Sequence, residues 1–192
     1  MKKYIVPTVV ITLVAALILI AYTIAAPARA AARDLEAING ITVGRMTEAE
    51  LLGRSAFQKV DRHCAEADCI YHTERMNSFL RLLHLAPSTF FGVAVWVRNG
   101  MVVQVDVFVS REGLTPIRLS QKSALPAECA SNPCVKHFVL PNKKLVKIDI
   151  LFNNESDFRN RMPEAVQTAC LSRMRGCTSY EELMPLGRGL NL

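Results

Sequence analysis

One uninterrupted apolar stretch, residues 4–26, dominates the hydrophobic pattern of the chain. It contains no charged side chain, and Met1, Lys2 and Lys3 precede it. As a helix it extends about 35 Å, enough to cross a hydrocarbon core about 30 Å thick. The pattern predicts a transmembrane signal-anchor within residues 1–30, with the lysines in a short cytoplasmic stub and the body outside the cytoplasm, periplasmic or extracellular.

A cleaved signal peptide is the alternative interpretation of the same segment. Ala26-Pro27-Ala28 and Ala28-Arg29-Ala30 both place small residues where a signal peptidase cuts. The apolar part of a signal peptide is only about 7–15 residues long, so length favours the uncleaved anchor. In one case the protein stays in the membrane through residues 4–26, and in the other it is secreted after cleavage.

Beyond the apolar stretch, the pattern predicts a linker over residues 31–46 and a single domain over residues 47–192. Thr47 and Glu50 form a capping box, in which each side chain bonds a free backbone N–H at a helix start. Further helices are expected around residues 158–169 and after residue 178. Before Pro87, four apolar side chains recur at helical spacing, namely Met76, Phe79, Leu80 and Leu83.

Two pairs of neighbouring segments predict β-hairpins, the first because it is rich in valine and the second because apolar and polar side chains alternate in it. Residues 92–98 and 101–110 flank Asn99-Gly100, the strongest short signal for a type I′ turn. Residues 135–140 and 145–152 form the second pair. The chain is therefore expected to be an α+β protein, with helices flanking a roughly four-stranded antiparallel sheet.

The second predicted strand separates its side chains by face. Val103, Val105, Val107 and Val109 share one face, and Gln104 and Asp106 point to the other. Trp96 and Phe108 also lie opposite the valine row. If helices cover one side of the sheet, the other side is available to a protein partner or a lipophilic ligand.

The charge of the chain does not indicate a nucleic-acid partner. The formal net charge is +6, and residues 1–30 hold three basic residues and no acid. The remainder has 20 basic and 17 acidic residues, a net of +3, and the basic residues are scattered. No phosphate-binding loop or nucleophile elbow is present, so the sequence argues against an enzyme and predicts no cofactor.

Six cysteines stand in three close pairs: Cys64 with Cys69, Cys129 with Cys134, and Cys170 with Cys177. Outside the cytoplasm such pairs are typical of disulfides. Six cysteines permit 15 connectivities, of which nearest-neighbour pairing is preferred. Residues five apart in a continuous helix are about 8 Å apart at Cα, beyond the bridging limit of about 7 Å, so the chain must turn between such partners.

A metal site is the alternative role for four of these cysteines. Cys64-x4-Cys69-x2-His72 recurs as Cys129-x4-Cys134-x2-His137, and each copy offers three of the four ligands that zinc prefers. Oxidised cysteines do not bind zinc in this way, so the expected compartment favours disulfides. Asp61 and His63 suggest a hydrolase only weakly.

The favoured interpretation is a membrane-anchored, disulfide-stabilised module outside the cytoplasm that binds or scaffolds a partner. The alternative is an extracytoplasmic metal-binding protein or metal-dependent enzyme that uses the two cysteine–histidine copies.

Overall fold

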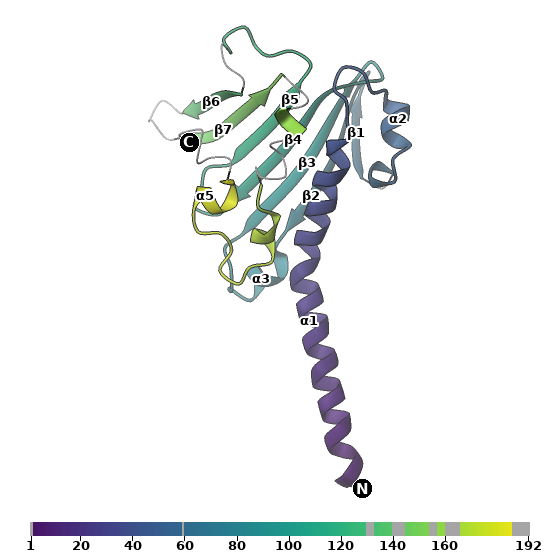
Figure 1. The fold of residues 1–192 in the computed structure, drawn as a ribbon, viewed down its shortest axis with the longest axis vertical. Coiled ribbons are helices and arrows are strands. Elements are labelled where there is room, and N and C mark those ends of the chain that lie inside the picture. The colour runs from purple at the N-terminus through teal and green to yellow at the C-terminus, as the bar shows by residue number, and fades with distance from the viewer. Residues whose placement is uncertain are drawn as a thin grey trace.

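A long N-terminal helix, α1 (Lys2–Asn39), carries the chain from a free end onto one face of a β-sheet (Figure 1). Its first half projects away from the body, and its side chains are exposed as far as Thr23 over the described positions. Its second half packs on the sheet through a stripe of buried apolar residues, Ala31, Leu35 and Ile38. The computed structural model describes residues 2–58, 60–129, 133–139, 145–153, 157–159 and 166–185.

The apolar helix is continuous with the body. The segment expected to be a linker, residues 31–46, is helical as far as Asn39, because its apolar stripe extends the amphipathic face of α1. Within α1 lies an 18-residue window that is long and apolar enough to cross a membrane, and none of that window is buried against the rest of the chain. The helix could therefore serve as an anchor.

The sheet is larger than predicted and is mixed. Seven strands lie in the order β1-β2-β3-β4-β5-β7-β6, and all neighbours are antiparallel except β5 and β7, which are parallel. The α+β class is confirmed, whereas the four-stranded antiparallel sheet is corrected. The strands are β1 (Asp61–Ala65), β2 (Asp68–Met76), β3 (Thr89–Arg98), β4 (Met101–Arg111), β5 (Ile117–Lys122), β6 (Cys134–Val139) and β7 (Leu145–Phe152).

Both predicted hairpins are present. Asn99 and Gly100 join β3 to β4 with φ angles of 51° and 73°, the left-handed conformation that a type I′ turn requires. β6 and β7 pair as the second hairpin, whose expected turn at residues 141–144 lies outside the described residues. Strands β1, β2 and β5 were not predicted.

The short helices lie at the margins of the sheet. The capping box is confirmed at the start of α2 (Glu48–Leu52), where the Glu50 carboxylate accepts hydrogen bonds from the Thr47 N–H and hydroxyl. These bonds lower the pKa of Glu50. The short helix η1 (Ser55–Phe57) follows it. The apolar repeat before Pro87 forms only a five-residue helix, α3 (Ser78–Leu82), because Met76 still belongs to β2.

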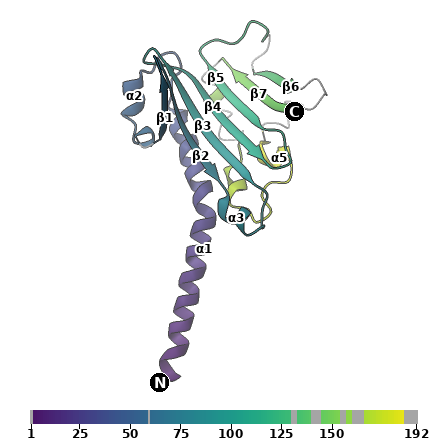
Figure 2. The ribbon, with the colours of Figure 1, turned by 180° about the vertical axis from the view of Figure 1, so that it is seen from behind.

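Helices cover one face of the sheet in the part of the chain that the structure describes. The upper half of α1, η2 (Thr168–Leu171) and α5 (Tyr180–Leu183) lie on this face, over the buried valines of β3 and β4. Seen from behind, β1 and β2 lie in front of the upper part of α1, and no described helix lies in front of β2 to β5 (Figure 2). Of the helix expected at residues 158–169, residues 160–165 lie outside the described part.

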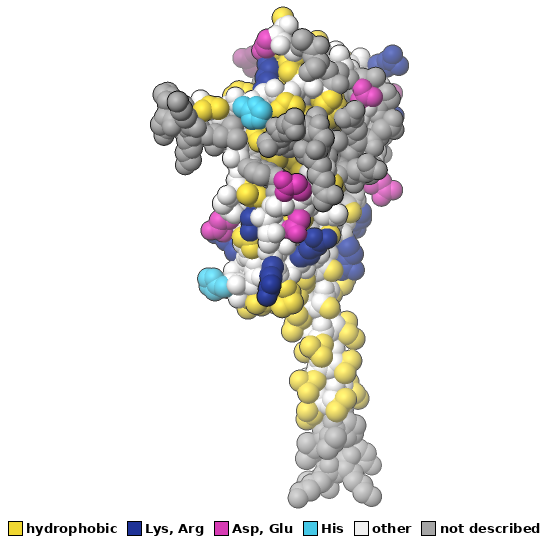
Figure 3. Space-filling view, turned by 60° about the vertical axis from the view of Figure 1, so that its left-hand side comes forward, with side chains coloured by type: hydrophobic (Ala, Val, Ile, Leu, Met, Phe, Trp, Pro, Cys, Tyr) yellow, Lys and Arg dark blue, Asp and Glu magenta, His cyan; other side chains and the backbone are white. Residues whose placement is uncertain are grey.

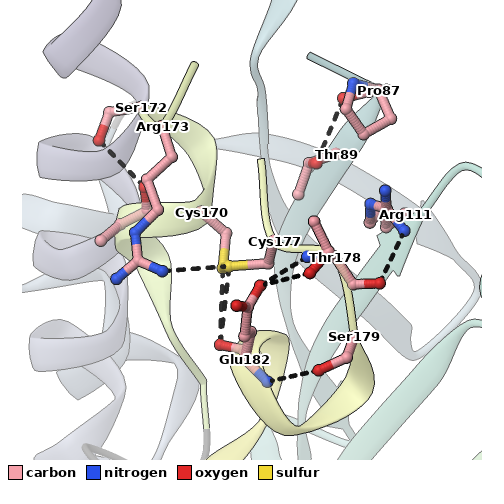
Figure 4. The surroundings of a disulfide bond; sticks show 11 residues. Pro87, Thr89, Arg111, Cys170, Ser172, Arg173, Cys177, Thr178, Ser179 and Glu182 are labelled. Carbon is pink, nitrogen blue, oxygen red and sulfur yellow. Dashed lines mark hydrogen bonds between the residues drawn. A yellow bond between two sulfur atoms is a disulfide. The ribbon is translucent and has the colours of Figure 1, made fainter. Parts of the chain in front are cut away.

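Each close cysteine pair lies at disulfide distance, with Cα–Cα separations of 4.1, 5.5 and 5.2 Å in chain order. The chain turns between Cys64 and Cys69, which face each other across the β1–β2 hairpin. Cys170 and Cys177 join η2 to the segment before α5 (Figure 4). There the Glu182 carboxylate accepts from the Thr178 N–H at 2.6 Å, which lowers the pKa of Glu182.

Candidate functional site

The candidate site is the sheet face that points away from α1, which we call the open face. Successive side chains of a strand point to opposite faces, so the residues between the buried valines of β3 and β4 all belong to it. The surface is therefore built from alternate positions on neighbouring strands. Its central members are Phe90, Trp96, Gln104, Asp106, Phe108, Arg118, Ser120 and Asp149.

A buried carboxylate, Asp106, organises the centre of the open face. Its side chain is fully buried, although it lies on the face that no described helix covers. It accepts hydrogen bonds from Trp96 Nε1 at 2.8 Å, from Ser120 Oγ at 2.5 Å and from Gln104 Nε2 at 2.6 Å. Its direct cross-strand partner is Ala94, whose small side chain leaves room for the larger neighbours to close over the carboxylate.

A second buried carboxylate, Asp149, lies two strands away on β7. Arg118 of β5 binds both of its oxygens, one of them through Nε at 3.1 Å, and Lys147 Nζ lies 3.2 Å from it. An Arg118 guanidinium nitrogen is also 4.0 Å from Asp106 Oδ2. Arg118 therefore stands between two carboxylates that are almost completely buried. Buried charges persist only when they are paired and hydrogen-bonded, and both acids satisfy that condition here.

Aromatic side chains flank this polar centre. Trp96, Phe90 and Phe108 are each partly exposed, and the indole of Trp96 is held in one orientation by its bond to Asp106. Gly92, the cross-strand partner of Phe108, makes space for a ring, because a Cβ at this position would lie 3.0 Å from the Phe90 ring. The open face thus presents aromatic surface, with one indole held in place, beside a paired cationic group.

The covered face carries a different polar group at its edge. Tyr71 of β2 is buried, and its hydroxyl donates to Glu48 at the start of α2. Arg62 of β1 bonds the same carboxylate at 2.9 Å. Burial raises the pKa of Tyr71 to about 12, and the hydrogen bond to Glu48 acts in the same direction. This cluster joins the first two strands to α2 and is structural.

The structure does not bring the predicted metal ligands together. β1 and β6 are the two edge strands, so the two cysteine–histidine copies lie at opposite ends of the sheet. Within each copy the second cysteine and the histidine are three residues apart in one strand. Cys69 and His72 therefore point to opposite faces, and so do Cys134 and His137. Among the described residues, no three His, Cys, Asp or Glu side chains converge as a metal site.

The weak hydrolase candidates lie on the β1–β2 hairpin. The ring of His63 stacks on that of His72, with centroids 5.1 Å apart, and Asp61 is the cross-strand partner of His72. These three side chains lie on the face of the Trp96 cluster, at its β1 edge. Stacked rings and a register pair are explained by strand pairing alone.

Sequence reasoning identified part of the open face and missed the rest. A carboxylate inside a valine-rich strand, Asp106, was the visible signal, and its neighbours Trp96 and Gln104 are on the predicted hairpin. Arg118 and Ser120 were missed because β5 was not predicted. Asp149 lies within the predicted strand 145–152, but its approach to Arg118 depends on the parallel pairing of β5 with β7.

Comparisons with protein-family models, with curated proteins and with solved structures gave no match to this chain.

Proposed function

We propose that this chain is a single-pass membrane protein that holds its body outside the cytoplasm and binds a protein partner on the open face. The apolar half of α1 has the length for one crossing, and its lysines favour a cytoplasmic N-terminus. Three cysteine pairs at disulfide distance fit an oxidising compartment. The body then stays attached to the membrane as a stapled α+β domain.

The observation that carries the binding proposal is the fixed tryptophan over a buried carboxylate. Trp96 and Arg118 belong to the residue types that contribute most to protein–protein binding energy, and both are held in place before any partner arrives. A side chain that is already ordered loses less conformational entropy when it is buried. Apolar residues would fill the Asp106 and Asp149 positions at lower desolvation cost, so the network favours specificity over simple stability.

The dimensions of the sheet also suit a protein partner. Seven strands at a spacing of about 4.8 Å extend about 29 Å across, and a ten-residue strand such as β3 extends about 33 Å. A face of this size is comparable to the roughly 800 Å² that each protein contributes to a standard interface. A broad, nearly continuous strand surface matches another protein better than it encloses a small ligand.

Site-specific photocrosslinking in the native membrane tests the binding proposal. A photoreactive phenylalanine analogue at position 108 is expected to give a discrete crosslinked protein, and Trp96→Ala is expected to abolish it. The matched control places the analogue at Ala49, an exposed position on α2 away from the open face. No product from position 108, or the same product from both positions, would reject the proposal. A crosslinked lipid at position 108 would assign the face to a lipophilic ligand instead.

The compartment is tested by the intact mass of the protein isolated from its membrane and alkylated without reductant. We expect no alkyl adducts and a mass that retains residues 1–30. Adducts on several cysteines would contradict the oxidising compartment, and a mass lacking the first 28 or 30 residues would indicate a secreted protein.

A further inference from the structure

The end of the domain that carries α3 lies beside the part of α1 where the apolar segment ends. A groove of about 540 Å³ is lined there by Tyr22, Thr23 and Ala26 of α1, and by Met76 and Phe79 from β2 and α3. Because α1 is one helix from Lys2 to Asn39, no flexible connection separates the apolar segment from the body. The height of α3 relative to that segment is therefore fixed by the fold.

Exposed apolar side chains gather at this end of the domain. Outside α1, seven large apolar side chains of the described residues are exposed, and five of these belong to α3, its flanks and the loop after η2. Leu82 is 75% exposed and Met174 is 61% exposed. The two segments are neighbours, since a Cβ on Gly176 would lie 3.4 Å from the ring of Pro87. We call this surface the base. It consists of the apolar residues Met76, Leu82, Leu83, Leu85 and Met174 and of the basic residues Arg81, His84, Arg173 and Arg175.

Figure 3 shows apolar side chains around the point where α1 leaves the body, with basic side chains above them. A soluble surface rarely keeps several large apolar side chains exposed together unless they contact a partner.

Basic side chains surround these apolar residues. Arg81 and His84 lie on and just after α3, and Arg173 and Arg175 flank Met174, all of them exposed. Residues 77–87 and 166–176 contain no acidic residue, and exposed Glu74 is the acidic residue in the lining of the groove. Arginine alternating with leucine and methionine is typical of segments that lie in the headgroup region of a bilayer, with the apolar chains directed to the acyl boundary and the cations to phosphates.

An exposed tyrosine marks the same level on the helix. Tyr22 is stacked under the Arg29 guanidinium, 4.5 Å from the ring centroid, at the end of the apolar stretch. Tyrosine is enriched where a membrane-spanning helix meets the interface. Tyr4 begins the stretch 18 residues earlier, about 27 Å along the helix, so the two tyrosines are separated by nearly the thickness of a hydrocarbon core.

We propose that the base of the body docks on the bilayer that α1 crosses, with its leucines and methionines at the acyl boundary and its arginines on anionic phospholipid headgroups. This inference rests on the proposed membrane anchor and adds a second contact between body and bilayer. The charge of the two loops and their continuity with the apolar helix favour a lipid surface over a protein. Docking fixes the tilt of the body on the membrane.

Fluorescence quenching by brominated phospholipids tests the proposal on the full chain in nanodiscs. Trp96 is the single tryptophan, so Leu82→Trp combined with Trp96→Phe places one probe at the base. We expect roughly a twofold loss of its emission when lipids brominated near the headgroup are used. The matched control, Ala49→Trp with Trp96→Phe, places the probe on exposed α2 and is expected to keep its emission.

The composition of the disc tests the role of the arginines. Discs of zwitterionic phosphatidylcholine alone are compared with discs containing about 30 mol% phosphatidylglycerol, and stronger quenching is expected with the anionic lipid. Arg81→Gln, Arg173→Gln and Arg175→Gln together are expected to remove that difference. Equal quenching in both discs would overturn the electrostatic part of the proposal.

Co-migration of the protein with the discs shows whether α1 inserts into the bilayer, independently of the quenching. If the protein co-migrates but the probe at position 82 is not quenched, the docking proposal fails and the anchor stands. If the protein does not enter discs at all, the anchor itself fails. A position-82 probe that is unquenched in every disc but shielded from aqueous iodide in the native membrane would assign the base to a protein and overturn the lipid assignment.

Discussion

The two faces of β3 and β4 use alternate residues of the same strands and are stabilised in different ways. On the covered face, Val95 and Val105 are cross-strand partners packed under the helices. One position along, Ala94 faces Asp106, and the carboxylate is surrounded by hydrogen-bond donors. Apolar packing orders the side chains of the covered face, and hydrogen bonds order those at the centre of the open face. The difference indicates that hydrogen bonds within the sheet order the centre of the open face, over which no described helix lies.

The energetic consequences of the two arrangements also differ. Apolar burial tolerates modest changes of shape, whereas a buried carboxylate depends on each of its partners. Substitutions on the covered face should therefore act mainly on stability, and those on the open face mainly on binding and on the environment of Trp96.

Leu119→Ala should cost the most. Leu119 lies in β5 on the covered face and is fully buried, and removing such a side chain typically costs about 2–5 kcal/mol. The matched change on the open face, Phe108→Ala, removes a partly exposed ring and should cost about 1 kcal/mol. Urea unfolding measures both free energies. Equal costs would mean that the open face is covered as completely as the other one.

Opening the Cys170–Cys177 bridge should have the next largest effect. Both sulfurs are buried, and the bridge holds η2 over the covered face. The chain-entropy contribution of so short a loop is about 2.5 kcal/mol, and a looser η2 adds lost packing. Replacing both cysteines by alanine should therefore lower the thermal midpoint more than the same change at Cys129 and Cys134, which join β6 to the preceding loop. A larger effect at the second pair would contradict this order.

Asp106→Asn should have an intermediate effect. The amide retains one acceptor oxygen but turns the other acceptor into a donor, so one of the three present donors loses its partner. We expect a loss of about 1–2 kcal/mol in unfolding free energy and a change in the emission of Trp96, the single tryptophan. Ser120→Ala should change the emission less, because it leaves the indole bond intact. Unchanged emission in the Asp106 variant would exclude the proposed orientation of the indole.

Tyr71 should produce the smallest effect, and that effect should depend on pH only in alkali. Its pKa is raised to about 12, so its contribution to stability is fully present below the unfolded pKa of about 10 and is lost as pH rises through about 12. Wild type should therefore lose stability relative to Tyr71→Phe between about pH 9 and pH 11. Denaturation midpoints of both proteins at the two pH values measure the change. A constant difference would mean that Tyr71 ionises as an ordinary exposed tyrosine.

Local patterns predicted the elements whose information is contained in one segment. The apolar part of α1, the turn at Asn99-Gly100 and the cap at Thr47 all depend on residues a few positions apart. β2 was missed because histidine, glutamate and arginine interrupt its apolar positions. β5 is six residues long and pairs in parallel with a strand that follows β6, an arrangement that no local pattern encodes.

The same limit applies to the candidate site. Trp96 and Asp106 are ten residues apart on one hairpin, and their shared face follows from alternation. Arg118 and Asp149 are 31 residues apart on strands that meet only through the sheet order. Trp96 and Phe108 could thus be placed on the open face from the sequence, whereas Phe90 and the ion pair of Arg118 with Asp149 could not.

The direction of α1 determines how the open face is oriented relative to the membrane. The helix lies along the plane of the sheet, and its free half continues in that plane (Figures 1 and 2). With that half embedded in a bilayer, the plane of the sheet is roughly perpendicular to the membrane. The open face with Trp96 then points parallel to the membrane surface. A partner anchored in the same membrane would then reach the open face by lateral diffusion, with both proteins already oriented by the bilayer.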